Sequence, residues 1–319
     1  MKKISLIDLH SHMGNILSPF PWVAEKILKQ EIDLIKILNR YEEKKEKIII
    51  VTNFYLVYPL ENSYKNFIDQ KRKIEKQIES INQNKKDSIK VIQSKNDLDD
   101  DFTIGIIWAI ESCRWMKDYK VILPKVWQEG VRMLTPIHFL SNFIGATCNE
   151  PYVPYNQVKG KFLTTKGREF LRISSQMGFM LDLSHMHAET LNDAIDVIKD
   201  NLLFSHIGLA DFVPFKRNVL LSTMKKISQK NSLIGLIAWK KLIKNEEIFF
   251  RNINHLVHHK LENHIGIGTD YGAPINTLRG LRDYSSIEET INGSNLDASL
   301  KSKIMADNAF EFIKKALPV

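Results

Sequence analysis

Eight short apolar stretches recur along the chain, and polar or charged segments separate them. They cover residues 4–7, 48–54, 103–110, 131–136, 179–183, 201–204, 233–237 and 264–268. Their length and their content of isoleucine, leucine and valine indicate buried strands. Helical spacing between most of them gives a pattern in which β and α alternate. Eight such units predict a parallel (β/α)8 TIM barrel that occupies residues 1–319 as a single domain.

The segments between the strands carry apolar residues at helical spacing. We expect helices over residues 163–177, 189–199 and 299–315, and a loop followed by a helix over 19–41. The segment 61–98 is highly charged but keeps apolar residues at helical positions. It predicts a helical exterior elaboration of the barrel, with a short edge strand at 88–93. We interpret the acidic cluster at 97–101 as a solvated cap before the next strand, although it resembles a metal site.

Polar residues that can bind a metal or react follow six of the eight apolar stretches. His10 and His12 are two residues apart on the first strand, so their imidazoles point to the same side. In a (β/α)8 barrel the carboxyl ends of all strands surround one mouth, where active sites form. We therefore expect these polar residues to converge there: His10, His12, Glu111, His138, His185, His206 and Asp270.

Imidazoles and a carboxylate at one mouth predict a site for two divalent metal ions. His10 and His12 would bind the first ion, Glu111 would bridge to the second, and His185 and His206 would complete the second site. Two ions that share a carboxylate activate a water molecule near neutral pH and hold the attacked oxygen. The ligand types suit zinc, manganese or cobalt.

Each candidate also has a structural interpretation. A lone histidine is more often a hydrogen-bonded structural residue, but His185 and His206 each follow a strand and a serine in the same way. Glu111 ends a nearly uncharged strand, where an unpaired carboxylate would be costly to bury. Asp270 could cap a helix, but its place after an apolar strand favours the mouth, as a metal ligand, a general base or both. The other histidines are interpreted as structural or surface residues: His187, His255, His258, His259 and His264.

Composition excludes several other classes of protein. The net charge of +8 would suit an anionic partner, but the lysines are spread along helical stretches, so we do not expect nucleic-acid binding. Cys113 and Cys148 are the only cysteines and do not form a disulfide framework. The apolar run at 4–7 is too short for a signal peptide, and no stretch reaches the roughly 18 apolar residues of a membrane span. We expect a cytoplasmic protein without a membrane partner.

Taken together, these residues resemble the membrane dipeptidase (renal dipeptidase) family of metallopeptidases. The resemblance runs through most of the chain and preserves the order of the family's motifs. They are Asp8-Leu9-His10-Ser11-His12, Ile110-Glu111, Arg132-Met133-Leu134-Thr135-Pro136-Ile137-His138, Leu163 to Glu169, Leu181-Asp182-Leu183-Ser184-His185, Phe204-Ser205-His206, Arg217-Asn218-Val219, Gly266-Ile267-Gly268-Thr269-Asp270, Gly280 to Ser285, and Asp307-Asn308.

The resemblance implies a zinc-dependent dipeptidase that uses two metal ions and a metal-bridging hydroxide. His138 would polarise the scissile carbonyl and stabilise the oxyanion, and Arg217 would hold the free carboxylate of a dipeptide-like substrate. Asp270 would carry the proton and also touch the metal. The sequence does not fix the oligomeric state and leaves a homodimer open. The metal positions implied are His10, His12, Glu111, His185, His206 and Asp270.

Four departures from the family's pattern lie near the expected mouth. His12 replaces an aspartate, which makes the first ion's site less anionic. Ser112 and Cys113 replace a pair of glycines. Tyr271 begins a segment that departs from Phe-Asp-Gly, and residues 238–241 lack an aromatic-rich ending. These changes affect dipeptide specificity more than they affect metal binding.

Two other functions fit part of the pattern. The opening Asp-Leu-His-Ser-His is also typical of the polymerase-and-histidinol-phosphatase phosphoesterases, which usually carry a late Asp-x-His pair that this chain lacks after Asp270. A barrel that binds a ligand but no longer catalyses a reaction is the alternative from outside the enzymes. The full set of ligand candidates favours the hydrolase.

Overall fold

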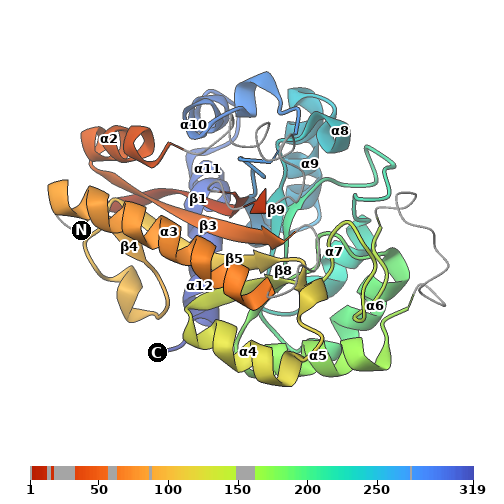
Figure 1. Ribbon diagram of the computed structural model, residues 1–319. Helices are drawn as coiled ribbons and strands as arrows, with labels where there is room; N and C mark the ends of the chain where they lie inside the picture. The colour runs from red at the N-terminus through yellow and green to blue at the C-terminus, as the bar shows by residue number, and fades with distance from the viewer. Residues whose placement is uncertain are drawn as a thin grey trace.

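Eight parallel strands form a closed barrel in the computed structural model, which describes residues 2–12, 16–17, 33–56, 63–85, 88–148, 162–273 and 275–319. In the order β3-β1-β10-β9-β8-β7-β6-β5, neighbours are hydrogen-bonded, and pairing of β3 with β5 closes the ring (Figure 1). This confirms the predicted TIM barrel. Its strands are β1 (Lys3–Ser11), β3 (Glu46–Leu56), β5 (Ile104–Glu111), β6 (Val131–Thr135), β7 (Met180–Asp182), β8 (Leu202–Ile207), β9 (Ser232–Leu236) and β10 (Ile265–Ile267).

Two short strands extend the sheet outside the ring. β2 (Ile16–Leu17) pairs with the end of β3. β4 (Ile89–Val91) pairs with the first half of β5, while β6 pairs with the second half. The edge strand predicted at 88–93 is therefore confirmed.

Helices surround the barrel (Figure 1). Those predicted at 163–177 and 189–199 are confirmed within a few residues, and that at 299–315 is interrupted by a π-helical turn at Lys303–Asp307. The helix predicted within 61–98 is α3, which buries Phe67, Ile74 and Ile78. Of the loop and helix predicted over 19–41, residues 19–32 lie outside the described residues. The helices are α2 (Leu34–Lys44), α3 (Ser63–Asn84), α4 (Tyr119–Gln128), α5 (Thr165–Gln176), α6 (Ala188–Val197), α7 (Leu221–Ile227), α8 (Lys240–Ile243), α9 (Glu246–His258), α10 (Tyr284–Asn292), α11 (Ala298–Ser302) and α12 (Asn308–Ala316).

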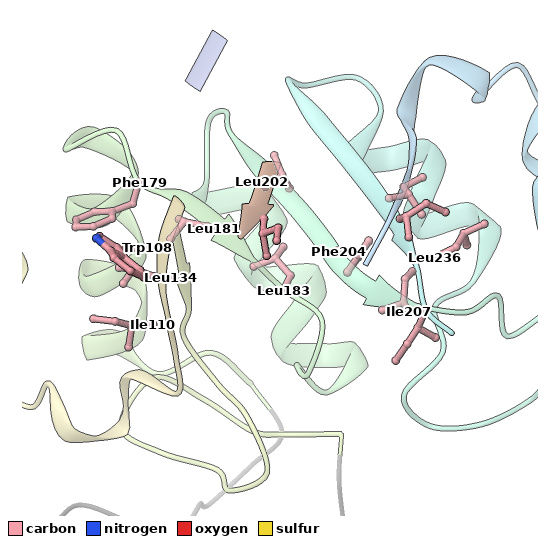
Figure 2. Packing of buried hydrophobic residues seen from close by; sticks show 14 of the residues in the cluster. Trp108, Ile110, Leu134, Phe179, Leu181, Leu183, Leu202, Phe204, Ile207 and Leu236 are labelled. Atoms are coloured by element: carbon pink, nitrogen blue, oxygen red, sulfur yellow. The ribbon is translucent and has the colours of Figure 1, made fainter. Parts of the chain in front are cut away.

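Alternation along the strands divides the core into two layers. On β5, Ile107 and Ala109 belong to an inner cluster, whereas Trp108 and Ile110 belong to an outer cluster that packs against the helices. Figure 2 shows part of the outer layer, where Trp108 and Phe179 lie close to Leu134. Both layers are buried, so the strands are held from either side, and their ends are fixed in place.

Strand β1 is longer than the predicted 4–7 and continues through His10 to Ser11, and His12 follows directly after it. Its pairing with β3 shifts register between Asp8 and Ser11. This irregularity breaks the alternation, because Leu9 belongs to the inner core while the next residue, His10, faces Glu111. His10 and His12 still point toward the same carboxylate, as predicted from their spacing.

Candidate metal centre

The carboxyl ends of six barrel strands bring the predicted site residues together. Glu111, the last residue of β5, lies at the centre and is buried. Five imidazoles present Nε2 within 4.0 Å of one of its carboxylate oxygens. The distances are 3.3 Å from His10, 3.5 Å from His12, 3.4 Å from His138, 3.4 Å from His185 and 4.0 Å from His206.

Asp270 completes the cluster from the end of β10. Its Oδ1 lies 3.3 Å from Nε2 of His12 and 3.9 Å from Nε2 of His10. Its backbone N–H donates to the carbonyl of His10 at 2.8 Å, which ties the end of β10 to β1. Asp270 caps no helix among the described residues, so its carboxylate is directed to the cluster.

The geometry of these groups fits divalent metal ions. Two ligand atoms that each lie about 2.0–2.1 Å from one tetrahedral zinc ion are about 3.3 Å apart. The Nε2 atoms of His185 and His206 are 3.1 Å apart. Nε2 of His10 and Oε1 of Glu111 are buried without a hydrogen-bond partner among the described residues, although both belong to groups that could hold an ion. Buried polar atoms without partners are costly, and a bound cation would satisfy them.

Electrostatics also favour a cation at this position. Burial alone would raise the pKa of Glu111, but His138 and His10 hold it well below its ordinary value, so the carboxylate is charged. Burial lowers the pKa of His185 and of His206 well below the ordinary value, which leaves both imidazoles neutral. The charged carboxylate beside the neutral imidazoles of His185 and His206 is a set of ligands that suits a divalent transition metal.

His138 and Arg217 lie on the side of the cluster that includes His185. The ring of His138 is 4.2 Å from that of His185, and burial lowers the pKa of His138 to about 4. Arg217 is buried; it donates to the backbone carbonyl of Ser184, and its Nη2 lies 2.9 Å from Nε2 of His185. A neutral hydrogen-bond donor and a fixed cation are thus next to the candidate metal site.

Several residues beside the cluster were missed in the sequence. Asp8 is fully buried and accepts hydrogen bonds from the backbone and side chain of Thr269 and from the hydroxyl of Tyr284. Ser205 Oγ lies 3.0 Å from Nδ1 of His10 and donates to the carboxylate of Asp182 at 2.7 Å. The cost of burying a carboxylate in an apolar strand, which identified Glu111, applies equally to Asp8 and Asp182 and could have found them.

Three other predictions, for His187, Ser112 and Asp97, can be compared with the structure. His187 caps α6 by accepting from the backbone of Glu189, in agreement with its interpretation as structural. Ser112 adopts a φ of +75°, a conformation that favours the glycine it replaces. The side chain of Asp97 accepts from the backbone of Gln93 and Ser94, as expected of a cap.

Comparison with known proteins assigns the chain to a family. The sequence profile described as membrane dipeptidase (peptidase family M19) matches residues 1–317. The chain belongs to the membrane dipeptidase family. This metallopeptidase family is the one that the sequence motifs resemble, and its members include dipeptidases.

Curated relatives match part of the chain. Dipeptidase tcpJ of Claviceps purpurea is 24% identical over 197 residues, which cover 58% of this chain and 45% of that protein. An uncharacterized dipeptidase of Schizosaccharomyces pombe is 23% identical over 200 residues, or 59% and 46% of the two chains. The aligned part therefore spans less than half the length of these relatives.

Solved structures share the whole fold of this chain. A dipeptidase described as a metallopeptidase of family M19 superposes with a TM-score of 0.80 at 18% identity and covers 100% of both chains. A metallopeptidase from Rhodobacter sphaeroides, liganded with a phosphinate mimic of the dipeptide L-Ala-D-Ala, gives a TM-score of 0.77 at 18% identity and covers 99% of this chain and 100% of its own. In the described part of this chain, no helix has the length and apolar character needed to cross a membrane.

Proposed function

We propose that this member of the membrane dipeptidase family is a metal-dependent dipeptidase that hydrolyses a dipeptide or a similar small amide. The observation that carries the proposal is the position of Arg217 against His185, at the edge of the imidazole cluster. A buried guanidinium there can hold the free carboxylate of a small substrate by a bidentate contact. The substrate's amide bond would then lie over Glu111 and His138.

We propose two ions, both zinc, with the ligands that the family resemblance implies. His10, His12 and Asp270 would hold one ion, His185 and His206 the other, and Glu111 would bridge them; the distances of 3.1–3.5 Å among most of these groups support this division. When bound, the ions would activate water and polarise the attacked carbonyl.

Side chains of this chain would carry out the remaining steps. Asp270 would take a proton from the attacking water at its carboxylate and pass it to the leaving amine. His138, which is neutral because its pKa is low, would donate a hydrogen bond to the oxygen that becomes negative. The contacts of both groups with the cluster support these roles: Asp270 Oδ1 lies 3.3 Å from Nε2 of His12, and Nε2 of His138 lies 3.4 Å from Glu111 Oε1.

The location and the assembly are also proposals. The two cysteines among the described residues are free and buried, which is compatible with a cytoplasmic protein. A homodimer would be compatible with the site, because all of its groups come from one chain.

The test is hydrolysis of a dipeptide panel, including L-Ala-D-Ala, by metal-loaded protein. Asp270→Asn should lower kcat about 10²- to 10⁴-fold, because it removes the proton carrier. Asp283→Asn is the control: this aspartate caps α10 by accepting from the backbone of Ser286, and its described contacts do not include the cluster, so kcat should not change. Unchanged turnover in Asp270→Asn would remove its role. Release of phosphate from phosphomonoesters without dipeptide cleavage would refute the proposed function, and so would fewer than one bound ion per chain.

A further inference from the structure

A single buried carboxylate, Asp182, organises the ends of three neighbouring strands. It is 1% exposed. Its Oδ1 accepts from the hydroxyl of Ser184 at 2.5 Å and from the backbone N–H of Ser205 at 2.9 Å. Its Oδ2 accepts from the hydroxyls of Thr135 at 2.8 Å and Ser205 at 2.7 Å. An ionised carboxylate can only accept, so each of these hydroxyls gives its hydrogen to Asp182.

The hydroxyl of Ser205 also lies between two imidazoles. Its Oγ is 2.6 Å from Nδ1 of His206 and 3.0 Å from Nδ1 of His10. A serine hydroxyl has one hydrogen and two lone pairs. Because the hydrogen goes to Asp182, both lone pairs are left to accept, and each imidazole must carry its hydrogen on Nδ1. The opposite assignment would bring two oxygens to 2.7 Å with no hydrogen between them.

The position of the hydrogen decides which nitrogen can bind a metal. With Nδ1 protonated, Nε2 of His10 and Nε2 of His206 keep lone pairs directed at the cluster. These atoms lie 3.3 Å from Glu111 Oε1 and 3.1 Å from His185 Nε2, respectively. His10 belongs to the proposed first site and His206 to the second. Their rings are 3.8 Å apart, so one hydroxyl reaches a ligand of each site.

We propose that Ser205, held by Asp182, is a positioning residue that sets the ligating tautomer of one histidine in each ion site and so couples the metal affinities of both. The inference rests on the proposed two-ion site. The tautomer of His12 does not depend on Ser205, because Nδ1 of His12 lies 3.2 Å from the backbone carbonyl oxygen of Asn53. Outer hydrogen bonds to metal-ligating histidines typically change metal affinity by about 10- to 100-fold.

Ser205→Ala tests the proposal, and Ser184→Ala is its matched control. Both serines donate to Asp182 and both precede a histidine of the cluster. Ser184 Oγ, however, contacts no imidazole among the described residues: it lies 3.4 Å from Ser205 Oγ and accepts from the backbone N–H of His206 at 3.4 Å. Zinc and cobalt alone are titrated into the metal-free protein against a chromophoric chelator. In Ser205→Ala the affinity of both sites should fall about 10- to 100-fold. In Ser184→Ala both should stay within about threefold of wild type, because its hydroxyl contacts the backbone N–H of His206 and not the imidazole that binds the metal.

Asp182→Asn provides a second test that preserves shape. The amide nitrogen of the new asparagine would take the position of Oδ2 and donate a hydrogen bond to Ser205 Oγ. The hydroxyl hydrogen of Ser205 would then be donated to Nδ1 of an imidazole, so at least one ligand would change tautomer. The affinity of at least one site should fall, while thermal unfolding of each metal-free variant reports whether the fold survives. Two ions at wild-type affinity in Ser205→Ala, loss of only one of them, or an equal loss in Ser184→Ala would overturn the proposal. Wild-type protein that binds two ions but cleaves no dipeptide would refute the proposed function and leave this inference standing.

Discussion

Gly268 should be essential for metal binding because a side chain there would collide with the backbone that carries His206. It lies directly after β10, and a Cβ atom would come within 1.7 Å of the carbonyl oxygen of Ser205. Real Cβ contacts are essentially never shorter than 3.0 Å, so Gly268→Ala must separate the two backbones by more than 1 Å. A carbonyl oxygen cannot rotate away as a side-chain tip can.

The cost should appear in metal affinity more than in folding. Overpacking of this kind costs about 1–3 kcal/mol, which a barrel of this size can absorb. Ligands, however, must be held within about 0.5 Å of their productive positions. A shift of more than 1 Å at Ser205 and His206 should therefore lower the affinity of the ion site by at least about 10-fold.

Metal titration and thermal unfolding of Gly268→Ala measure both effects. Gly266→Ala is the control from the same strand, because its Cβ would meet only side-chain atoms of Leu9 and Leu233, at 3.0 Å or more. It should keep wild-type affinity and lose little stability. Gly268→Ala that binds two ions as tightly as wild type would refute the reasoning, since the strand would then have moved without displacing the ligand.

Three further predictions concern specificity and stability. Phe139 is 49% exposed and its ring lies 4.1 Å from that of His138. Phe139→Ser should therefore lower kcat/KM about 10-fold for dipeptides with large apolar side chains and leave kcat/KM for Gly-Gly unchanged. An equal loss for all substrates would contradict this prediction. The buried carboxylate of Glu288 accepts from three side chains of α2, so Glu288→Gln should cost about 1–3 kcal/mol in denaturant unfolding, whereas the exposed Glu289→Gln should be neutral. Burial would raise the pKa of Asp97, but hydrogen bonds from two backbone N–H groups outweigh this effect and hold the pKa below its ordinary value. The stability that results is present above about pH 3.9 and is lost as the pH falls through the pKa of the folded state. Asp97→Asn should therefore flatten the acid side of the curve of unfolding free energy against pH.

The barrel and the cluster at its mouth could be predicted because each leaves a local signal. Apolar runs predicted the strands. Histidines at the strand ends were the ligand candidates, and the structure brings the side chains of two of them, His185 and His206, together. The network behind them could not be predicted in the same way. Ser205 and Asp182 are ordinary polar residues within motifs, and their roles depend on the hydrogen-bonded register of β7 and β8, where Asp182 pairs with Leu203.

Local irregularities of the backbone could not be predicted from the sequence either. The shift between Asp8 and Ser11 lets adjacent residues of β1 serve the inner core and the cluster, which strict alternation does not predict. The π-helical turn at Lys303–Asp307 interrupts a helix whose apolar spacing is continuous in the sequence. The spacing does not predict the turn, because such a turn depends on how the closing helix packs near β10 and β1.

The hydrogen-bonded seam between β1 and β10 has a consequence for biosynthesis. Asp8 and Ile267 are paired although more than 250 residues separate them, and a ribosome needs roughly 15–50 s to translate that distance. During this interval the edge of β1 that pairs with β10 has no partner strand, and His10 is made long before Asp270. The complete cluster therefore exists only once the chain has been made as far as Asp270, so any metal that it binds must be acquired after β10 has joined β1.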